Sequence, residues 1–267
     1  MASSLPAGPM RLACSRNEGR VGLALAFGMA VSGSSGAAGN PSPLGIRIES
    51  VTAVTAVARH RLTSFLAQAG CSADVRFGES EQDVVLEFRP GESGAGNEPV
   101  LVATNRTGDR PTPVWVTRRT AGVGSIAELA GRDLATVAGP DPLGSRLALE
   151  ALAKAGVTPA RQQLYEAGDF SSALGLLLHN NTHAAVSEAA FVEPMLEKNG
   201  LVVTWAGKPV SAGGWYRGAG WNMSALLCED ALAGLTRSGD RQIFAVFPEW
   251  VHGFSRPERL NSEEVSQ

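Results

Sequence analysis

The 267-residue sequence lacks any concentration of positive charge, and this argues against a protein that binds nucleic acid. Its 23 lysines and arginines are scattered along the chain, and 26 aspartates and glutamates bring the formal net charge to −3. Proteins that hold a phosphate backbone gather basic side chains on one face or along one helix. We therefore expect no nucleic acid among the partners.

Common catalytic motifs are also missing. The sequence has no Gly-x-Ser-x-Gly nucleophile elbow, no P-loop and no Gly-x-Gly-x-x-Gly dinucleotide-binding fingerprint. The acidic pair Glu229-Asp230 lies where the start of a helix would favour negative charge in any case. These absences argue against an enzyme, and we expect no catalytic residues.

Residues that bind metal ions are few and poorly spaced for that purpose. The sequence contains four histidines and three cysteines, without a Cys-x-x-Cys pair. His179 and His183 are four residues apart, but the Asn180-Asn181 pair between them is typical of a turn, which removes them from a shared helical face. We therefore expect neither a metal ion nor a cofactor.

Only one long apolar run is present, and it lies near the amino terminus. Three arginines within residues 11–20 precede the apolar stretch 21–31, and small residues follow it. This three-part order is typical of a secretory signal peptide, and its apolar part is too short to span a bilayer. Residues 1–38 are predicted to be such a peptide, so we expect a periplasmic or otherwise exported protein. A retained anchor or a disordered leader is the alternative.

Export would leave two cysteines, Cys71 and Cys228, in the mature chain. An even number in an oxidising compartment permits one disulfide. Two separate buried thiols are an equally good interpretation, because free cysteine behaves as a small apolar residue. The sequence leaves the choice open.

What the sequence does contain is an alternation of strand and helix patterns, which predicts an α/β fold. The composition, 44% hydrophobic and 18% charged, suits a soluble protein large enough for two lobes. Ser125 and Glu128 form a capping-box pattern before a short helix that ends at Gly131. Strands are expected at 46–49, 74–77, 83–88, 100–104, 114–117, 134–138, 162–166, 184–188, 201–205 and 224–227, and helices at 53–69, 125–130, 146–155, 173–179, 189–198, 230–235 and 241–253.

Between about residues 98 and 236, the sequence resembles the phosphate/phosphonate-type periplasmic substrate-binding proteins of ABC transporters. The stretches that carry the resemblance are 113–119, 125–140, 152–159 and 169–188. The resemblance implies a type II periplasmic-binding-protein-like fold, in which two α/β lobes close over a ligand in the cleft between them. The hinge would lie near 112–118 and 206–213. Lobe 1 would comprise residues 41–112 and 207–267, and lobe 2 residues 113–206.

The first lobe is expected to be shortened. Only the residues between Phe77 and Asp83 separate two predicted strands. A crossover between parallel strands normally needs a dozen or more residues, including a helix. That side of the cleft is therefore expected to be reduced or rearranged.

The resemblance implies a non-catalytic, exported solute-binding protein, expected to be a monomer. It would capture a small molecule and offer it to an ABC permease in the inner membrane. An enzyme or a sensor module on the same fold is the less favoured reading, because fold alone does not fix function.

Candidate ligand-binding residues lie mainly where strands end and helices begin, because the first amides of a helix are unpaired and carry partial positive charge. Aromatic side chains in the glycine-rich segment 213–221 would supply flat apolar walls. Arg89 would meet an anionic end of a ligand. The full candidate set is Arg89, Leu143, Gly144, Ser145, Asp169, Phe170, Ser171, Glu188, Trp215, Tyr216 and Trp221.

The chain departs from the resemblance in the loops that would hold a phosphonate. Of the side chains in 141–145, only Ser145 can donate a hydrogen bond, and Asp141 adds negative charge. Asp169-Phe170 stands where phosphonate binders have a Ser-His pair, although Asp169 also suits a helix N-cap. We therefore expect a less anionic, small organic ligand, with a relative of the phosphorus oxyanions still open. The alternative is a hydrophobic ligand such as a lipid or sterol, and the aromatic segment 213–221 is the feature that favours it.

Overall fold

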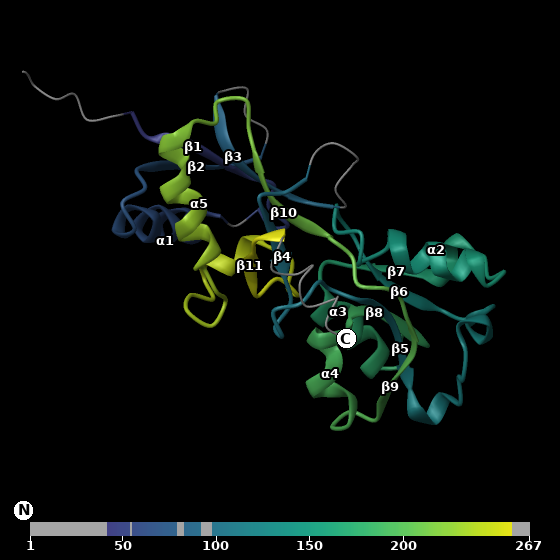
Figure 1. Ribbon diagram of the computed structural model, residues 1–267. Coiled ribbons are helices and arrows are strands. Elements are labelled where there is room, and N and C mark those ends of the chain that lie inside the picture. Colours follow the sequence, from purple (N-terminus) through teal and green to yellow (C-terminus); the bar gives the residue numbers. More distant parts are fainter. Residues whose placement is uncertain (1–41, 54, 79–82, 92–97, 258–267) are drawn as a thin grey trace, which may run out of the picture. The chain divides into compact units, whose positions relative to one another are not determined.

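The computed structural model describes residues 42–53, 55–78, 83–91 and 98–257, and Figure 1 shows the arrangement of their helices and strands. The predicted signal peptide, residues 1–38, lies outside these described residues. Residues 41–267 form one compact unit. Within that unit the strands form two separate sheets, as an α/β fold with two lobes requires.

The first sheet has six strands in the order β11-β4-β10-β3-β1-β2. Strands β2 and β3 both pair in parallel with β1, whereas β10 runs antiparallel to β3 and β4, and β11 antiparallel to β4. These strands are β1 (Leu44–Ile48), β2 (Ala73–Phe77), β3 (Val84–Pro90), β4 (Leu101–Thr104), β10 (Gly213–Arg217) and β11 (Gly253–Ser255).

The second sheet has five strands in the order β7-β6-β8-β5-β9. Strand β6 pairs in parallel with β7 and β8, and β5 runs antiparallel to β8 and β9. These strands are β5 (Pro113–Arg118), β6 (Leu134–Val137), β7 (Leu164–Ala167), β8 (Ala184–Glu188) and β9 (Leu201–Ala206).

Helices pack against both sheets. Helix α1 contacts β2 of the first sheet and α5 contacts β11, while α2, α3 and α4 contact strands of the second sheet. The α-helices are α1 (Ala56–Gln68), α2 (Arg146–Lys154), α3 (Phe170–Leu178), α4 (Ala189–Leu196) and α5 (Leu226–Ala233). Short 3-10 helices are η1 (Arg119–Ala121), η2 (Ile126–Leu129), η3 (Arg161–Gln163), η4 (Met223–Ala225) and η5 (Ile243–Val246).

Two segments connect the sheets. Residues 105–112 lead from β4 to β5, and residues 207–212 lead back from β9 to β10. The first connection precedes most of the expected hinge at 112–118, because residues 113–118 are a fully paired strand of the second sheet. The division into lobes at these connections stays a prediction.

The first sheet buries an aromatic core. On β3, Phe88 points to the same side as Trp215 of β10, with ring centroids 5.6 Å apart. Phe247 meets Phe88 edge-on at 4.7 Å, and Phe254 contacts both Trp215 and Phe247. Edge-to-face pairs of this kind are the favoured arrangement of aromatic rings. The spaced aromatics of the carboxyl-terminal region therefore serve the core of this sheet.

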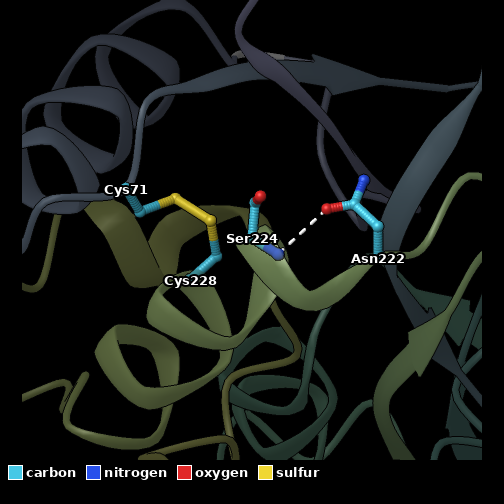
Figure 2. The surroundings of a disulfide bond; sticks show 4 residues. All are labelled: Cys71, Asn222, Ser224 and Cys228. Atoms are coloured by element: carbon cyan, nitrogen blue, oxygen red, sulfur yellow. Dashed lines mark hydrogen bonds between the residues drawn. A yellow bond between two sulfur atoms is a disulfide. The ribbon is translucent and has the colours of Figure 1, made fainter. Parts of the chain in front are cut away.

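The two cysteines form a disulfide, which settles the question that the sequence left open. Cys71 precedes β2 and Cys228 lies in α5, with Cα atoms 5.1 Å apart (Figure 2). Beside it, the Asn222 side chain accepts a hydrogen bond of 2.9 Å from the Ser224 N–H at the start of η4. The disulfide joins residues 157 positions apart and secures α5 to the first sheet.

Two predicted elements near the carboxyl terminus are wrong. Residues 224–227, expected as a strand, belong to η4 and α5, because the Asn222 side chain caps a helical turn there. Residues 241–253, expected as a helix interrupted at Pro248, contain only the 3-10 turn η5, an irregular segment and the first residue of β11. Pro248 lacks the N–H that a helix interior requires.

The predicted helix at 125–130 is a single 3-10 turn rather than an α-helix. Its capping differs from the expected box, because the Glu128 carboxylate accepts from the Ser125 hydroxyl (3.1 Å) and the Gly124 N–H (3.2 Å). Gly131 does adopt the left-handed conformation expected of a terminating glycine, with φ of 72°.

The shortened connection lies between β2 and β3. These two strands flank β1 on opposite sides, and both are parallel to it. Residues 79–82 are not described by the structure. The expected shortening of the first lobe stays a prediction.

Candidate ligand-binding site

Two loops of the second sheet begin side by side. Strands β6 and β7 are parallel neighbours, and their last residues, Val137 and Ala167, are paired. Loops 138–145 and 168–171 therefore leave the same edge of the sheet, before α2 and α3 respectively. Carboxyl ends of parallel strands are the usual ligand-binding edge of α/β sheets. The structure thus brings these two predicted loops together.

The first loop is compact and largely buried. Leu143 is fully buried, and a Cβ on Gly144 would lie 2.8 Å from the Val137 Cβ, so only glycine fits there without a shift. The Gly144 carbonyl accepts a 2.7 Å bond from the Val137 N–H, which closes the loop onto β6. Ser145 is half-buried at the start of α2 and makes no side-chain cap bond.

Asp141, in the same loop, has a buried carboxylate that accepts two hydrogen bonds. It accepts from the Leu143 N–H (3.0 Å) and from the indole N–H of Trp250 (2.8 Å). Burial raises the pKa of Asp141 to about 7, the two hydrogen bonds oppose this, and the charge of Glu188 adds to it. The loop therefore holds a carboxyl group whose protonation changes near neutral pH.

The second loop begins helix α3. Asp169 caps the helix by accepting a 2.7 Å bond from the Ser172 N–H, as its position predicted. Phe170 is 2% exposed and packs against Phe191, with ring centroids 6.0 Å apart. Ser171 donates to the Glu249 carboxylate from its N–H (2.8 Å) and from its hydroxyl (2.7 Å). The side chains of Asp169 and Ser171 are therefore already hydrogen-bonded within the chain.

Glu188 ends β8 and is completely buried. Its carboxylate caps α4 by accepting from the Phe191 N–H at 2.8 Å. It also accepts from the Asn105 side chain and from the Thr112 N–H, each at 3.1 Å. Glu188 therefore ties the second sheet to the connection at 105–112.

Arg89 lies on the first sheet beside two other charged side chains of β1 and β3. It pairs with the Glu87 carboxylate at 2.8 Å, and Arg47 donates to the same carboxylate. Its guanidinium lies 5.1 Å from the ring centroid of Tyr216. The charge of Arg89 is thus partly neutralised by Glu87, and its side chain remains 42% exposed.

The three predicted aromatics lie in different surroundings. Trp215 is fully buried in the aromatic core, and Tyr216 is 4% exposed under Arg89. Trp221 stacks under Arg217, 4.0 Å from the guanidinium carbon, and its indole N–H donates to Glu229 at 2.7 Å. Contacts with strands of the first sheet and with α5 account for all three positions.

Sequence reasoning missed Glu249 and Trp250, which reach the two loops from the segment between η5 and β11. The aromatic spacing of this segment indicated a helix, and no pattern in the sequence pointed to partners 78 and 109 residues away. The only local feature that could have drawn attention to them is that a carboxylate and an indole directly follow Pro248, a residue type that interrupts helices.

Two cavities lie away from these loops. One, of about 520 Å³, is lined by residues 104–108 together with Thr236, Ser238 and residues 252–255. The other, of about 390 Å³, lies between α1 and the segment 234–240. Neither is lined by a residue of the predicted ligand-binding set.

The described residues offer neither a metal-binding cluster nor a membrane-spanning helix. Within 42–53, 55–78, 83–91 and 98–257, no three His, Cys, Asp or Glu side chains are grouped so that they could hold a metal ion. In the same part of the chain, no helix combines the length and hydrophobicity needed to cross a bilayer.

The two sheets and their two connections are the architecture of the two-lobed class of binding proteins. Residues 91–259 match the family described as ABC transporter, phosphonate, periplasmic substrate-binding protein. The match covers more than half of the chain, which therefore belongs to this family of solute-binding proteins. No curated protein matches the sequence significantly.

Solved structures support the fold. A binding protein component of an ABC phosphonate transporter from Pseudomonas aeruginosa superposes with a TM-score of 0.53 at 12% identity, over 83% of this chain and 84% of that chain. A Xanthomonas citri protein bound to ATP superposes with a TM-score of 0.55 at 15% identity, over 84% of this chain and 96% of that chain. At these identities the likeness shows the fold, and the predicted two-lobed architecture is confirmed.

Proposed function

We propose that the protein is exported and captures a small organic molecule at the strand exits of β6 and β7, for delivery to an ABC permease. Membership of the phosphonate-type family supports both capture and a permease partner. The pattern of residues 1–38 supports export. The proposal also includes that the protein is a monomer, has no catalytic activity and binds no nucleic acid.

The ligand proposed is one that carries a hydroxyl or amino group rather than a phosphonate dianion. The observation that supports this most directly is the gathering of carboxylates around the two loops. Asp141 is close enough to Glu188 for its pKa to respond, and Glu249 already occupies the hydrogen-bond donors of Ser171.

Neither loop carries a lysine or arginine to offset these carboxylates. A dianion facing a carboxylate at a partly exposed site loses about 1 kcal/mol or more for each pair. A hydroxyl or ammonium group would instead donate a hydrogen bond to such a carboxylate. The charge distribution therefore favours donors over oxyanions.

The proposed contact residues are those that the sequence predicted. Support is strongest for Ser145 and Ser171, whose hydroxyls lie at the starts of neighbouring helices. Packing and capping already account for Phe170, Glu188 and Trp215. Support for a lipid or sterol ligand is correspondingly weaker, because the aromatic side chains of 213–221 pack against the first sheet and its arginines.

Thermal unfolding in the presence of single compounds tests the ligand class. The full chain would be screened with inorganic phosphate, methylphosphonate, amino acids, polyols and choline. A ligand present at a hundred times its Kd stabilises the folded protein by about 2.7 kcal/mol. We expect a hydroxyl- or amine-bearing compound to raise the midpoint of thermal unfolding, and we expect phosphate and methylphosphonate to leave it unchanged.

Native mass spectrometry of protein purified from its host provides an independent readout. A retained polar compound would agree with the proposal, and a retained lipid would contradict it. Stabilisation by methylphosphonate or phosphate would contradict the proposed ligand class while leaving the family's usual ligands in place.

A further inference from the structure

Two consecutive residues, Glu249 and Trp250, bridge the elements of the first sheet and the strand exits of the second. They lie between η5 and β11, and β11 is an edge strand of the first sheet. Their hydrogen-bond partners, Ser171 and Asp141, lie in the loops after β7 and β6. Two adjacent side chains thus contact two adjacent loops of the other sheet.

The Glu249 contact is bidentate and charge-assisted. One carboxylate oxygen accepts from the Ser171 N–H at 2.8 Å, and the other accepts from the Ser171 hydroxyl at 2.7 Å. Hydrogen bonds to a carboxylate are shorter and stronger than those between neutral groups. The nine-residue helix α3 also places partial positive charge at this end, which favours the carboxylate further.

The Trp250 contact is buried. The indole is fully buried, and its N–H donates to Asp141, which is itself only 5% exposed. A buried N–H that lost this acceptor would be left unsatisfied, which is costly. The indole therefore favours the arrangement in which it stays against the loop 138–145.

Arg237 braces the segment that carries both residues. Its guanidinium donates to the carbonyl oxygens of Val251 (2.6 Å), Pro248 (2.9 Å) and Phe244 (3.3 Å). It also lies 5.2 Å from the ring centroid of Phe244. Residues 244–251 thus form a braced arm rather than a loose loop, so Glu249 and Trp250 are presented in fixed positions.

The predicted contact residues of the two loops are buried or already hydrogen-bonded. Leu143 and Phe170, one in each loop, are 0% and 2% exposed, and the donors of Ser171 are occupied by Glu249. The Ser171 donors become free for a small molecule only when Glu249 moves away from them.

We propose that Glu249 and Trp250 form a clasp between the two lobes, which must release before a small molecule can reach the strand exits of β6 and β7. The clasp works through contacts at both loops, so loss of either contact weakens the closed arrangement. Its role in ligand entry rests on the proposed function, whereas the clasp itself does not.

The test uses the full chain without added ligand. Glu249→Ala removes the bidentate acceptor, and Trp250→Phe keeps an aromatic ring while removing the donor to Asp141. Glu249→Gln retains one oxygen acceptor for the Ser171 N–H. Glu193→Ala, at an exposed position of α4, is the matched control for loss of a glutamate side chain.

Two measurements report on release. Amide hydrogen exchange at Ser171 follows the local contact, and small-angle X-ray scattering follows the separation of the lobes through the radius of gyration. We expect exchange at Ser171 to rise about tenfold in Glu249→Ala, with a smaller rise in Glu249→Gln. Glu249→Ala and Trp250→Phe should both increase the radius of gyration, and Glu193→Ala should match the wild type.

Wild-type exchange at Ser171 in Glu249→Ala would overturn the clasp, as would scattering curves of Glu249→Ala and Trp250→Phe that superpose on the wild type. If Glu249→Ala failed to fold by circular dichroism, Glu249→Gln and Trp250→Phe would decide by the same readouts. Because no ligand is present, failure here is distinct from failure of the ligand screen.

Discussion

At the scale of single residues, the buried Asp141 carboxyl group has a strongly raised pKa. Its pKa is raised from 3.8 to about 7, chiefly by burial, with Leu143 and Trp250 donating to it and Glu188 adding negative charge. A folded-state pKa above the unfolded value means that the folded protein holds the proton more tightly. The resulting stability is fully present below about pH 4 and is lost as the pH rises through about 7.

The substitution Asp141→Asn removes this titration. Between pH 5 and 8 the wild type should lose unfolding free energy through Asp141, with a slope of at most about 1.4 kcal/mol per pH unit. In the variant this part of the slope should vanish, although loss of one hydrogen-bond acceptor lowers stability at every pH. Urea unfolding at several pH values measures the difference.

Asp169→Asn is the matched control, because asparagine is an equally good N-cap and Asp141 stays in place. It should retain the wild-type dependence of stability on pH. Parallel pH profiles for Asp141→Asn and the wild type would show that the Asp141 carboxyl group does not titrate in this range.

At the scale of elements, the alternating strands and helices of 113–206 could be predicted because their signals are local. The apolar run of β6, the cap at Asp169 and the stop at Gly131 each lie within a few residues of the element they define. The arm at 244–251 could not be predicted, because its conformation depends on bonds from Arg237 to three carbonyls.

The same division holds for the candidate site. The two strand-exit loops follow from the strand and helix pattern, and the structure confirms that they begin together. Their partners Glu249 and Trp250 come from a distant part of the chain, and nothing in a local pattern specifies so distant a contact. Likewise the burial of Trp215 follows from packing with Phe88 and Phe247.

Arg237 allows a prediction about the arm as an element. Burial lowers the pKa of Arg237 to about 10, a value that keeps the side chain charged at neutral pH. Arg237→Met would remove three hydrogen bonds from a charged donor, although the Phe244 and Pro248 carbonyls keep a backbone N–H donor, and we expect a loss of about 3 kcal/mol of unfolding free energy. Urea unfolding at pH 7 measures this loss.

Arg61→Met provides the comparison for this variant. Arg61 pairs with Asp240 at 2.7 Å, but its side chain is 46% exposed. An exposed pair contributes at most about 1 kcal/mol. If both arginine variants lost the same small amount, Arg237 would not be bracing the arm.

At the scale of the whole molecule, the disulfide closes a loop that contains every strand of the second sheet, since residues 113–206 lie between Cys71 and Cys228. A cross-link over so long a loop restricts the unfolded chain strongly, and we expect reduction to cost about 4 kcal/mol of unfolding free energy. Urea unfolding with and without dithiothreitol measures this loss. The Cys71→Ser, Cys228→Ser double variant is the control, and its unfolding free energy should not change when dithiothreitol is added. Equal midpoints for the oxidised and reduced wild type would contradict this contribution of the cross-link to stability.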